Sequence, residues 1–238
     1  MTLRCVIFDL GETLVENTET FMKSKVERNM KYLEAAGIKL AEEDLKQAIK
    51  KAREDIDNTH GTTKRFERAA YYKALFKHLN KDLDERTLDK VYSMYTIECI
   101  DDMKLLPNAL EVVIYCKELG LKLILITNGR KDMTDAILEK FGLEKYFDYV
   151  ITSYEFGHEK SSLEPFKHVL EKFGLQPKEC IVVGNRLDED IAAKKVGMLT
   201  VWLKRDDDKI LGKAEEPDFT ITRLSELKNI IEGQQETL

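Results

Sequence analysis

Polar side chains that could perform catalysis follow two short apolar runs in the sequence. Asp9 comes directly after the run 3–8, LRCVIF, and Gly11 lies two residues beyond it. Thr127 comes directly after the run 121–126, LKLILI. An aspartate carboxylate can act as a nucleophile or bind a hard cation, and a threonine hydroxyl can bind an anionic oxygen. These groups would form one site if the fold placed the ends of both runs side by side.

Two later segments carry side chains of complementary chemistry. Lys160 lies in the loop after the run 148–152, and Asn185 and Asp190 follow the run 180–183. In an open sheet of parallel strands, the carboxyl ends of the strands meet at one edge, and ligand sites form there. The pattern therefore predicts a site at this edge that contains Asp9, Thr127, Lys160 and Asp190.

The apolar runs themselves predict the strands that position these groups. Each run is a few residues long and apolar on both faces, which is typical of a buried parallel sheet. The expected strands are 3–8, 121–126, 148–152, 180–183, 199–203 and 218–222. Helix-like periodicity fills the intervals 107–119, 132–141, 162–173, 188–196 and 223–232. The alternation predicts an α/β fold with a doubly wound parallel sheet, that is, a Rossmann-like core.

Residues 16–104 interrupt the alternation of strands and helices. They contain no strand signal. Short connectors instead separate four amphipathic helical stretches, expected at about 18–36, 41–57, 64–79 and 85–100. We expect an inserted helical-bundle cap at 16–104 over the edge of the sheet, with the α/β core formed by 1–15 and 105–238.

Composition narrows the possible functions and partners. The chain has 238 residues, a formal net charge of −6 and 43% hydrophobic residues, which is typical of a folded protein. A general nucleic-acid binder needs a basic surface, so no nucleic-acid partner is expected. The cysteines form no C-x-x-C pair, which favours buried thiols over a zinc site. There is no signal-peptide pattern and no apolar run of about 20 residues, so we expect a cytoplasmic protein without a membrane partner.

Nearly the whole chain resembles the haloacid dehalogenase superfamily, whose members are mostly phosphohydrolases. The first motif of that family, D-x-D-G-T-L, appears here as D-L-G-E-T-L starting at Asp9. A strand ending in Thr127, followed by Asn128 and Gly129, is similar to the second motif, and Lys160 is similar to the third. The segment 184–190, GNRLDED, resembles the fourth. A helical insert between the first two motifs is similar to the most common cap of the family.

The resemblance implies a role for each matching residue. Asp9 would be the nucleophile and would form an aspartyl-phosphate intermediate. Thr127 would bind a phosphoryl oxygen, and Lys160 would neutralise the nucleophile and the transferring group. Substrate would also contact Asn128 and Gly129.

The resemblance also implies a magnesium ion as cofactor. Asp9, the backbone carbonyl of Gly11, Asn185 and Asp190 would form its site. Oxygen ligands of this kind suit Mg²⁺, which usually binds through one or two carboxylates and the substrate phosphate.

Two positions depart from the pattern of the family. Gly11 stands where most phosphatases have a second aspartate, which protonates the leaving group and activates water. Loss of a general acid or base typically costs roughly 10²–10⁴-fold in rate. The neighbouring Glu12 is therefore a candidate for proton transfer. Asn185 stands where an acidic metal ligand is usual, and its amide offers an oxygen without a charge.

These departures leave several functions open. The favoured function is a magnesium-dependent phosphatase of small phosphorylated metabolites with atypical acid–base chemistry. The alternatives are a dehalogenase-like hydrolase, a phosphonatase-like hydrolase and a catalytically decayed protein that binds a ligand. In the cap, the loop 58–65 offers Lys64 and Arg65 for a substrate anion. A monomer and a homodimer are both compatible with the sequence.

Overall fold

The computed structural model describes most of the core and part of the insert. The described residues are 2–16, 25–59, 68–81, 84, 86–87, 90–91, 100–101, 103–205 and 215–236. The chain divides into two compact units, one formed by Met1–Glu16 with Lys104–Leu238 and the other by Asn17–Met103.

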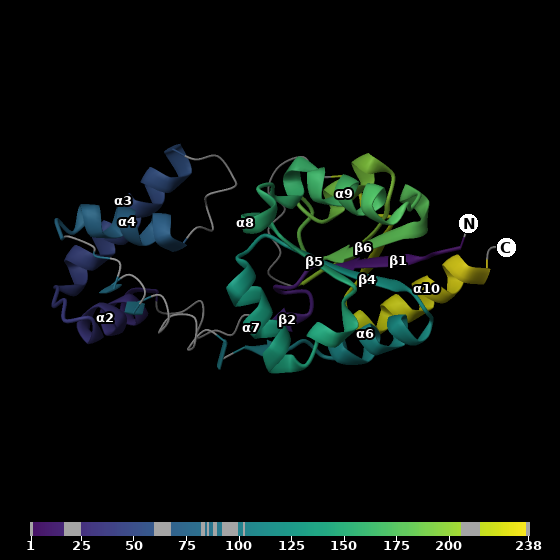
Figure 1. Ribbon diagram of the computed structural model, residues 1–238, viewed down its shortest axis with the longest axis horizontal. Helices are drawn as coiled ribbons and strands as arrows, with labels where there is room; N and C mark the ends of the chain where they lie inside the picture. The colour runs from purple at the N-terminus through teal and green to yellow at the C-terminus, as the bar shows by residue number, and fades with distance from the viewer. Residues whose placement is uncertain are drawn as a thin grey trace. The chain divides into compact units, whose positions relative to one another are not determined.

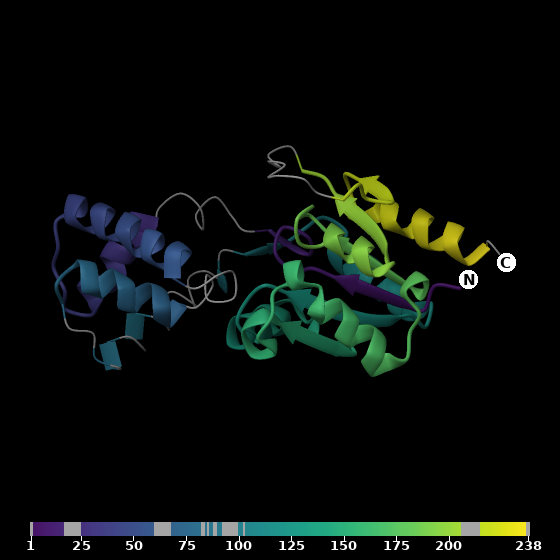
Figure 2. The same ribbon diagram turned by 90° about the horizontal axis from the view of Figure 1, so that it is seen from above.

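A six-stranded sheet forms the first unit. Its strands are β1 (Cys5–Phe8), β4 (Lys122–Thr127), β5 (Tyr149–Thr152), β6 (Cys180–Gly184), β7 (Leu199–Leu203) and β8 (Phe219–Ile221). They lie in the order β5-β4-β1-β6-β7-β8, and every neighbouring pair is parallel. Figure 2 shows β1, in purple, in the middle of the sheet, where it lies between β4 and β6. The predicted doubly wound parallel sheet is therefore confirmed, with each strand close to its expected place.

The central position of β1 explains its apolar sequence. β1 pairs with both β4 and β6, and all four of its side chains are buried. Burying a large apolar side chain stabilises the fold by roughly 1.5–3 kcal/mol, which offsets the cost of about 1–2 kcal/mol for fixing the backbone of one residue. The strand therefore holds its carboxyl end, and the residue that follows it, in a fixed place.

Helices cover both faces of this sheet. The α-helices are α6 (Ala109–Glu118), α7 (Lys131–Phe141), α8 (Ser153–Phe156), α9 (Glu164–Phe173) and α10 (Leu227–Glu236). The 3₁₀-helices are η2 (Glu144–Tyr146), η3 (Lys160–Ser162), η4 (Pro177–Glu179), η5 (Ile191–Val196) and η6 (Leu224–Glu226). Figure 1 shows α9 on one face, with α6 and α10 on the other. Phe166 and Val169 of α9 belong to the same buried cluster as Ile7 of β1 and Ile124 of β4.

One helical segment differs from the sequence-based expectation. The pattern predicts a helix over 188–196, whereas the structure has the 3₁₀-helix η5, which begins only at Ile191. The carbonyl of Arg186 accepts hydrogen bonds from the backbone amides of Asp190, at 2.8 Å, and Ile191, at 3.3 Å. This tight turn occupies the start of the expected helix.

A short antiparallel pair of strands follows β1. Its strands, β2 (Val15–Glu16) and β3 (Lys104–Leu105), are antiparallel. The second unit lies between these two strands in the sequence.

The second unit is helical in its described residues. Its helices are α2 (Lys25–Ala35), α3 (Glu42–Thr59) and α4 (Arg68–His78). Its buried side chains include Leu45 and Tyr72, and the Tyr72 hydroxyl donates a hydrogen bond of 3.2 Å to Oδ1 of Asn29. Most of the helix expected at 85–100 lies outside the described residues. Among the helices that are described, none combines the length and apolar character that crossing a membrane requires.

Candidate active site

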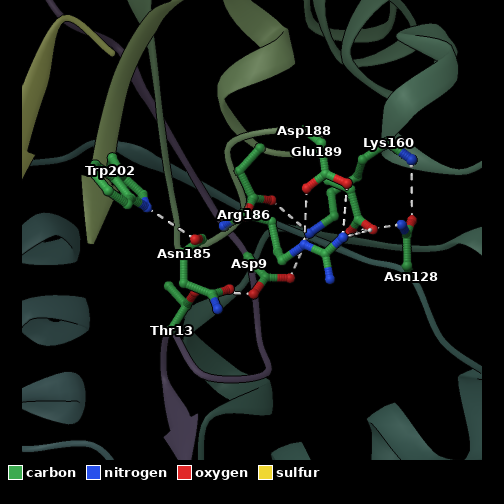
Figure 3. A network of polar contacts seen from close by, with 10 residues as sticks. Asp9, Thr13, Asn128, Lys160, Asn185, Arg186, Asp188, Glu189 and Trp202 are labelled. Carbon is green, nitrogen blue, oxygen red and sulfur yellow. Dashed lines mark hydrogen bonds and ion pairs between the residues drawn. The ribbon is translucent and has the colours of Figure 1, made fainter. Parts of the chain in front are cut away.

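Groups from four strand ends meet at the carboxyl edge of the sheet. Asp9 follows β1, Asn128 follows β4, Lys160 begins η3 after β5, and Asp190 follows β6. Figure 3 shows Asp9, Asn128 and Lys160 within one network of polar contacts, and Lys160 also contacts Asp190. The parallel pairing of β1 with β4 and β6 produces this meeting, since it brings three strand ends side by side.

Lys160 lies at the centre of the network. Its Nζ atom is 2.6 Å from Oδ1 of Asp9 and 2.6 Å from Oδ1 of Asp190. Burial alone would lower the pKa of Lys160, but the nearby carboxylates of Asp190, Asp9 and Glu189 raise it above its ordinary value. The ammonium group therefore stays charged and offsets part of the negative charge of the carboxylates around it.

Asp190 is completely buried beneath the edge of the sheet. Its Oδ2 atom accepts a hydrogen bond of 2.9 Å from the backbone amide of Arg186. Burial raises the pKa of Asp190 to about 7, against the opposing effect of Lys160. Gly184 makes room for this carboxylate, because a Cβ atom there would lie 2.1 Å from Cγ of Asp190.

Asp9 retains a small exposed area beside these groups, 7% of its surface. Its Oδ2 atom accepts a hydrogen bond of 2.9 Å from the hydroxyl of Thr13. Together with Lys160, this bond fixes both oxygens of the carboxylate. Sequence reasoning did not assign a role to Thr13, although its place in the first motif was the signal that could have identified it.

Thr127, Asn128 and Gly129 lie where β4 leaves the sheet. Thr127 is the last residue of β4 and is 9% exposed. The side chain of Asn128 is hydrogen-bonded within the protein. Its Oδ1 atom accepts a hydrogen bond from the backbone amide of Lys160 at 3.0 Å. Its Nδ2 atom donates to Oε2 of Glu189 at 2.9 Å. The carbonyl of Gly129 accepts a hydrogen bond from the amide of Tyr154, at 3.2 Å.

The turn after Asp9 carries Gly11 and Glu12. Gly11 carries no side chain that could transfer a proton. Glu12 adopts a left-handed backbone conformation, with φ of 59°, which is uncommon for a residue with a side chain. Its Oε2 atom lies 3.0 Å from Nη1 of Arg205, and the other Nη atom of Arg205 lies 3.4 Å from Oε1 of Glu16. The carboxylate of Glu12 is thus held by an arginine at the end of β7.

The donor atoms near Asp9 are compatible with a magnesium ion. The carboxylates of Asp9 and Asp190, the amide of Asn185 and the carbonyl of Gly11 are all oxygen donors. The backbone of Asn185 is anchored, because its carbonyl accepts a hydrogen bond of 3.0 Å from Nε1 of Trp202. No group of three His, Cys, Asp or Glu side chains able to hold a metal occurs among the described residues. Mg²⁺ often has only one or two carboxylate ligands and takes others from substrate, so this donor set still fits it.

Two predicted substrate contacts lie beyond what can be placed. Lys64 and Arg65 are outside the described residues.

Near the site, Arg186 is paired with Asp188 through two hydrogen bonds of 2.9 and 2.8 Å. Arg130 is paired with Asp132 in the same way, at 3.0 and 2.9 Å. Both guanidinium groups therefore already have carboxylate partners.

Comparison with known proteins gives consistent matches. A family model described as a haloacid dehalogenase-like hydrolase matches residues 3–197. A glyceraldehyde 3-phosphate phosphatase of Methanocaldococcus jannaschii is 29% identical over 232 residues, 97% of this chain and 98% of that protein. A protein of the same name from Methanothermobacter thermautotrophicus is 30% identical over 204 residues, 84% of each chain. The crystal structure of a HAD phosphatase from Thermococcus onnurineus has 25% sequence identity and a TM-score of 0.70, covering 98% of this chain and 100% of that one.

Proposed function

Because this chain belongs to the haloacid dehalogenase-like hydrolases, we propose that it hydrolyses small phosphate monoesters through Asp9. The observation that carries the proposal is the position of Lys160 between Asp9 and Asp190, 2.6 Å from each. Burying a charged group costs free energy unless a group of opposite charge pairs with it. Here the ammonium group of Lys160 pairs with both carboxylates. This arrangement holds a nucleophile ready while balancing its charge.

In the first step, an oxygen of Asp9 attacks the phosphorus atom of the substrate. The new bond joins this oxygen to phosphorus, while the bond from phosphorus to the leaving oxygen breaks. Thr127, with the backbone amide of Asn128, binds a phosphoryl oxygen, and Lys160 offsets the negative charge of the transferring group. Thr13 and Lys160 fix the orientation of the carboxylate through the contacts to its two oxygens.

In the second step, water attacks the phosphorus atom of the aspartyl-phosphate. The bond from Asp9 to phosphorus breaks, inorganic phosphate leaves, and the carboxylate is restored. A proton must reach the leaving oxygen in the first step and leave the water in the second. In this proposal Glu12 performs these transfers, but less effectively than a carboxylate at position 11 would, because Arg205 already pairs with it. Leaving groups that need no proton therefore react fastest.

Magnesium is the proposed cofactor, held by Asp9, Asp190, Asn185 and the carbonyl of Gly11. When bound, it supplies positive charge that draws the phosphoryl group to the nucleophile and stabilises charge on the transferring oxygens. The charges of the site support the need for a cation. Asp9, Asp190 and Glu189 act on the single ammonium group of Lys160, which leaves little positive charge for a phosphate dianion.

Three-carbon sugar phosphates are the first substrates to test, since two similar proteins carry the name glyceraldehyde 3-phosphate phosphatase. The test is phosphate release from glyceraldehyde 3-phosphate, from related monoesters and from an aryl phosphate, with and without Mg²⁺. The wild type should release phosphate, and Asp9→Asn should not. Equal release by both proteins would reject Asp9 as the nucleophile, and no release from any monoester would reject the phosphatase.

Gly11 supports one second candidate, a hydrolase whose leaving group needs no proton, such as halide. Asp9 would then attack a carbon atom, and halide would depart from it. Halide release from 2-haloacids, in place of phosphate release from monoesters, would favour this candidate.

A further inference from the structure

The side chain of Asn128 joins two loops of the site at once. Its Oδ1 atom accepts the backbone N–H of Lys160 at 3.0 Å, and its Nδ2 atom donates to Oε2 of Glu189 at 2.9 Å. The chemistry of the partners fixes the orientation of this amide. A backbone N–H needs an acceptor and a carboxylate needs a donor, so exchanging the oxygen and nitrogen would break both bonds. Figure 3 shows the bond to Lys160.

Glu189 takes no part in the proton and phosphoryl transfers proposed above, although it lies inside the network. Its side chain is 16% exposed, and its Oε1 atom is 3.4 Å from Nη2 of Arg186. Its neighbour Asp188 also pairs with Arg186 but is 44% exposed. Of these two adjacent carboxylates, Glu189 is the one that bonds to the residue following β4.

The chain of contacts ends at the nucleophile. Glu189 orients the Asn128 amide, the Asn128 amide holds the backbone of Lys160, and Nζ of Lys160 contacts Asp9 and Asp190. Lys160 is 2% exposed, so surrounding atoms leave little room to absorb a backbone shift. A displacement at Asn128 therefore reaches the ammonium group.

We propose that Glu189 is a positioning residue which, through the side chain of Asn128, keeps the ammonium group of Lys160 between Asp9 and Asp190. The catalytic part of this inference rests on the proposed phosphatase function. Its structural part, the hold on the backbone of Lys160, does not depend on any substrate.

The substrate-independent test is hydrogen exchange of the Lys160 amide, measured by NMR in the full chain. Glu189→Ala removes the acceptor that orients Asn128 and should accelerate this exchange. Glu189→Gln keeps an oxygen acceptor and should leave the exchange close to that of the wild type. Asp188→Ala is the matched control, because it removes a carboxylate from the same loop without removing an Asn128 contact. Unchanged exchange in Glu189→Ala, or equal acceleration in Asp188→Ala, would overturn the proposal.

The catalytic test is steady-state phosphate release from an aryl phosphate. Displacement of a reacting group by about 1 Å can cost roughly a hundredfold in rate, so Glu189→Ala should lower kcat by roughly ten- to a hundredfold. KM should change little, and Glu189→Gln should recover most of the rate. The double variant Asn128→Ala/Glu189→Ala should lose no more kcat than the more affected of the two single variants, because both residues act through one contact. Additive losses, or a loss in kcat that follows the melting temperature across all variants, would overturn positioning.

The two assays separate this inference from the proposed function. An inactive wild type with faster Lys160 exchange in Glu189→Ala would reject the phosphatase and the catalytic part, while supporting the structural part. An active wild type with unchanged exchange and rate in Glu189→Ala would reject the inference alone.

Discussion

Nζ of Lys160 lies 2.6 Å from Oδ1 of Asp9, and the two residues are 151 positions apart in the sequence. Both side chains are almost completely buried, at 2% and 8% exposure. Removing one partner of a buried ion pair leaves an uncompensated charge, which typically costs about 3–5 kcal/mol. This contact therefore links the stability of the core to the chemistry of the site.

Lys160→Met should lower the free energy of unfolding by about 3–5 kcal/mol and abolish phosphate release. The reason is that Asp9 and Asp190 would face each other without the ammonium group between them. Urea unfolding gives the stability, and an aryl phosphate gives the rate. Lys167→Met removes a lysine whose side chain is 48% exposed and should change stability by less than about 1 kcal/mol. A stable, active Lys160→Met protein would contradict the assignment.

Gly11 predicts a strong dependence of the rate on the leaving group. Without a carboxylate at this position, an aryl phosphate whose phenol is acidic should react much faster than an alkyl phosphate. Gly11→Asp should raise the rate for alkyl phosphates more than for aryl phosphates, by up to roughly 10²-fold. The measurement is kcat/KM across a series of phosphate esters. A flat series in the wild type would show that another residue already supplies the proton, and Glu12→Gln would then identify or exclude Glu12.

Gly184→Ala should displace Asp190 and weaken both the fold and the activity. The added Cβ would lie 2.1 Å from Oδ2 of Asp190 and 2.5 Å from its Cβ atom, so the carboxylate must move. Overpacking of this kind costs typically about 1–3 kcal/mol. Gly233→Ala is the control. Gly233 lies in α10, and a Cβ atom added there would have no neighbour within 4 Å. Phosphate release should fall only in Gly184→Ala, whereas Gly233→Ala should keep its activity and unfold at the same or a slightly higher temperature, since alanine favours a helix.

Metal dependence tests the donor set. Phosphate release should disappear in EDTA and return with Mg²⁺. Asn185→Asp adds the carboxylate that the family usually has and should lower the Mg²⁺ concentration for half-maximal activity by about tenfold, since charge strengthens such sites. Full activity in EDTA would contradict the proposed cofactor, and an unchanged Mg²⁺ requirement in Asn185→Asp would remove Asn185 from the metal site.

The sequence was sufficient to predict the strands and the edge on which the candidate residues gather. Short runs that are apolar on both faces are typical of strands covered on both sides, and parallel pairing then brings Asp9 and Asp190 together. The bond between Asn128 and Glu189 was not predictable in this way. This bond depends on the path of the loop after β6, where the carbonyl of Arg186 accepts hydrogen bonds from the backbone amides of Asp190 and Ile191.

The direction of side chains in the turn after β1 was equally hidden. Spacing alone does not say that Thr13 faces Asp9, or that Glu12 takes a left-handed conformation and pairs with Arg205. In a tight turn these directions are set by individual backbone angles, which a hydrophobic pattern does not encode. The contact of Glu12 with Arg205 also joins residues that are distant in the sequence.

In the proposed reaction, Asp9 carries the phosphoryl group during turnover. The measurement is to mix the protein with an aryl phosphate and Mg²⁺, quench it during turnover, and reduce it with borohydride before peptide mass spectrometry. Borohydride converts an aspartyl-phosphate into homoserine, so we expect homoserine at position 9 of the wild type. Phosphate release without modification of Asp9, or with modification of another aspartate, would contradict it.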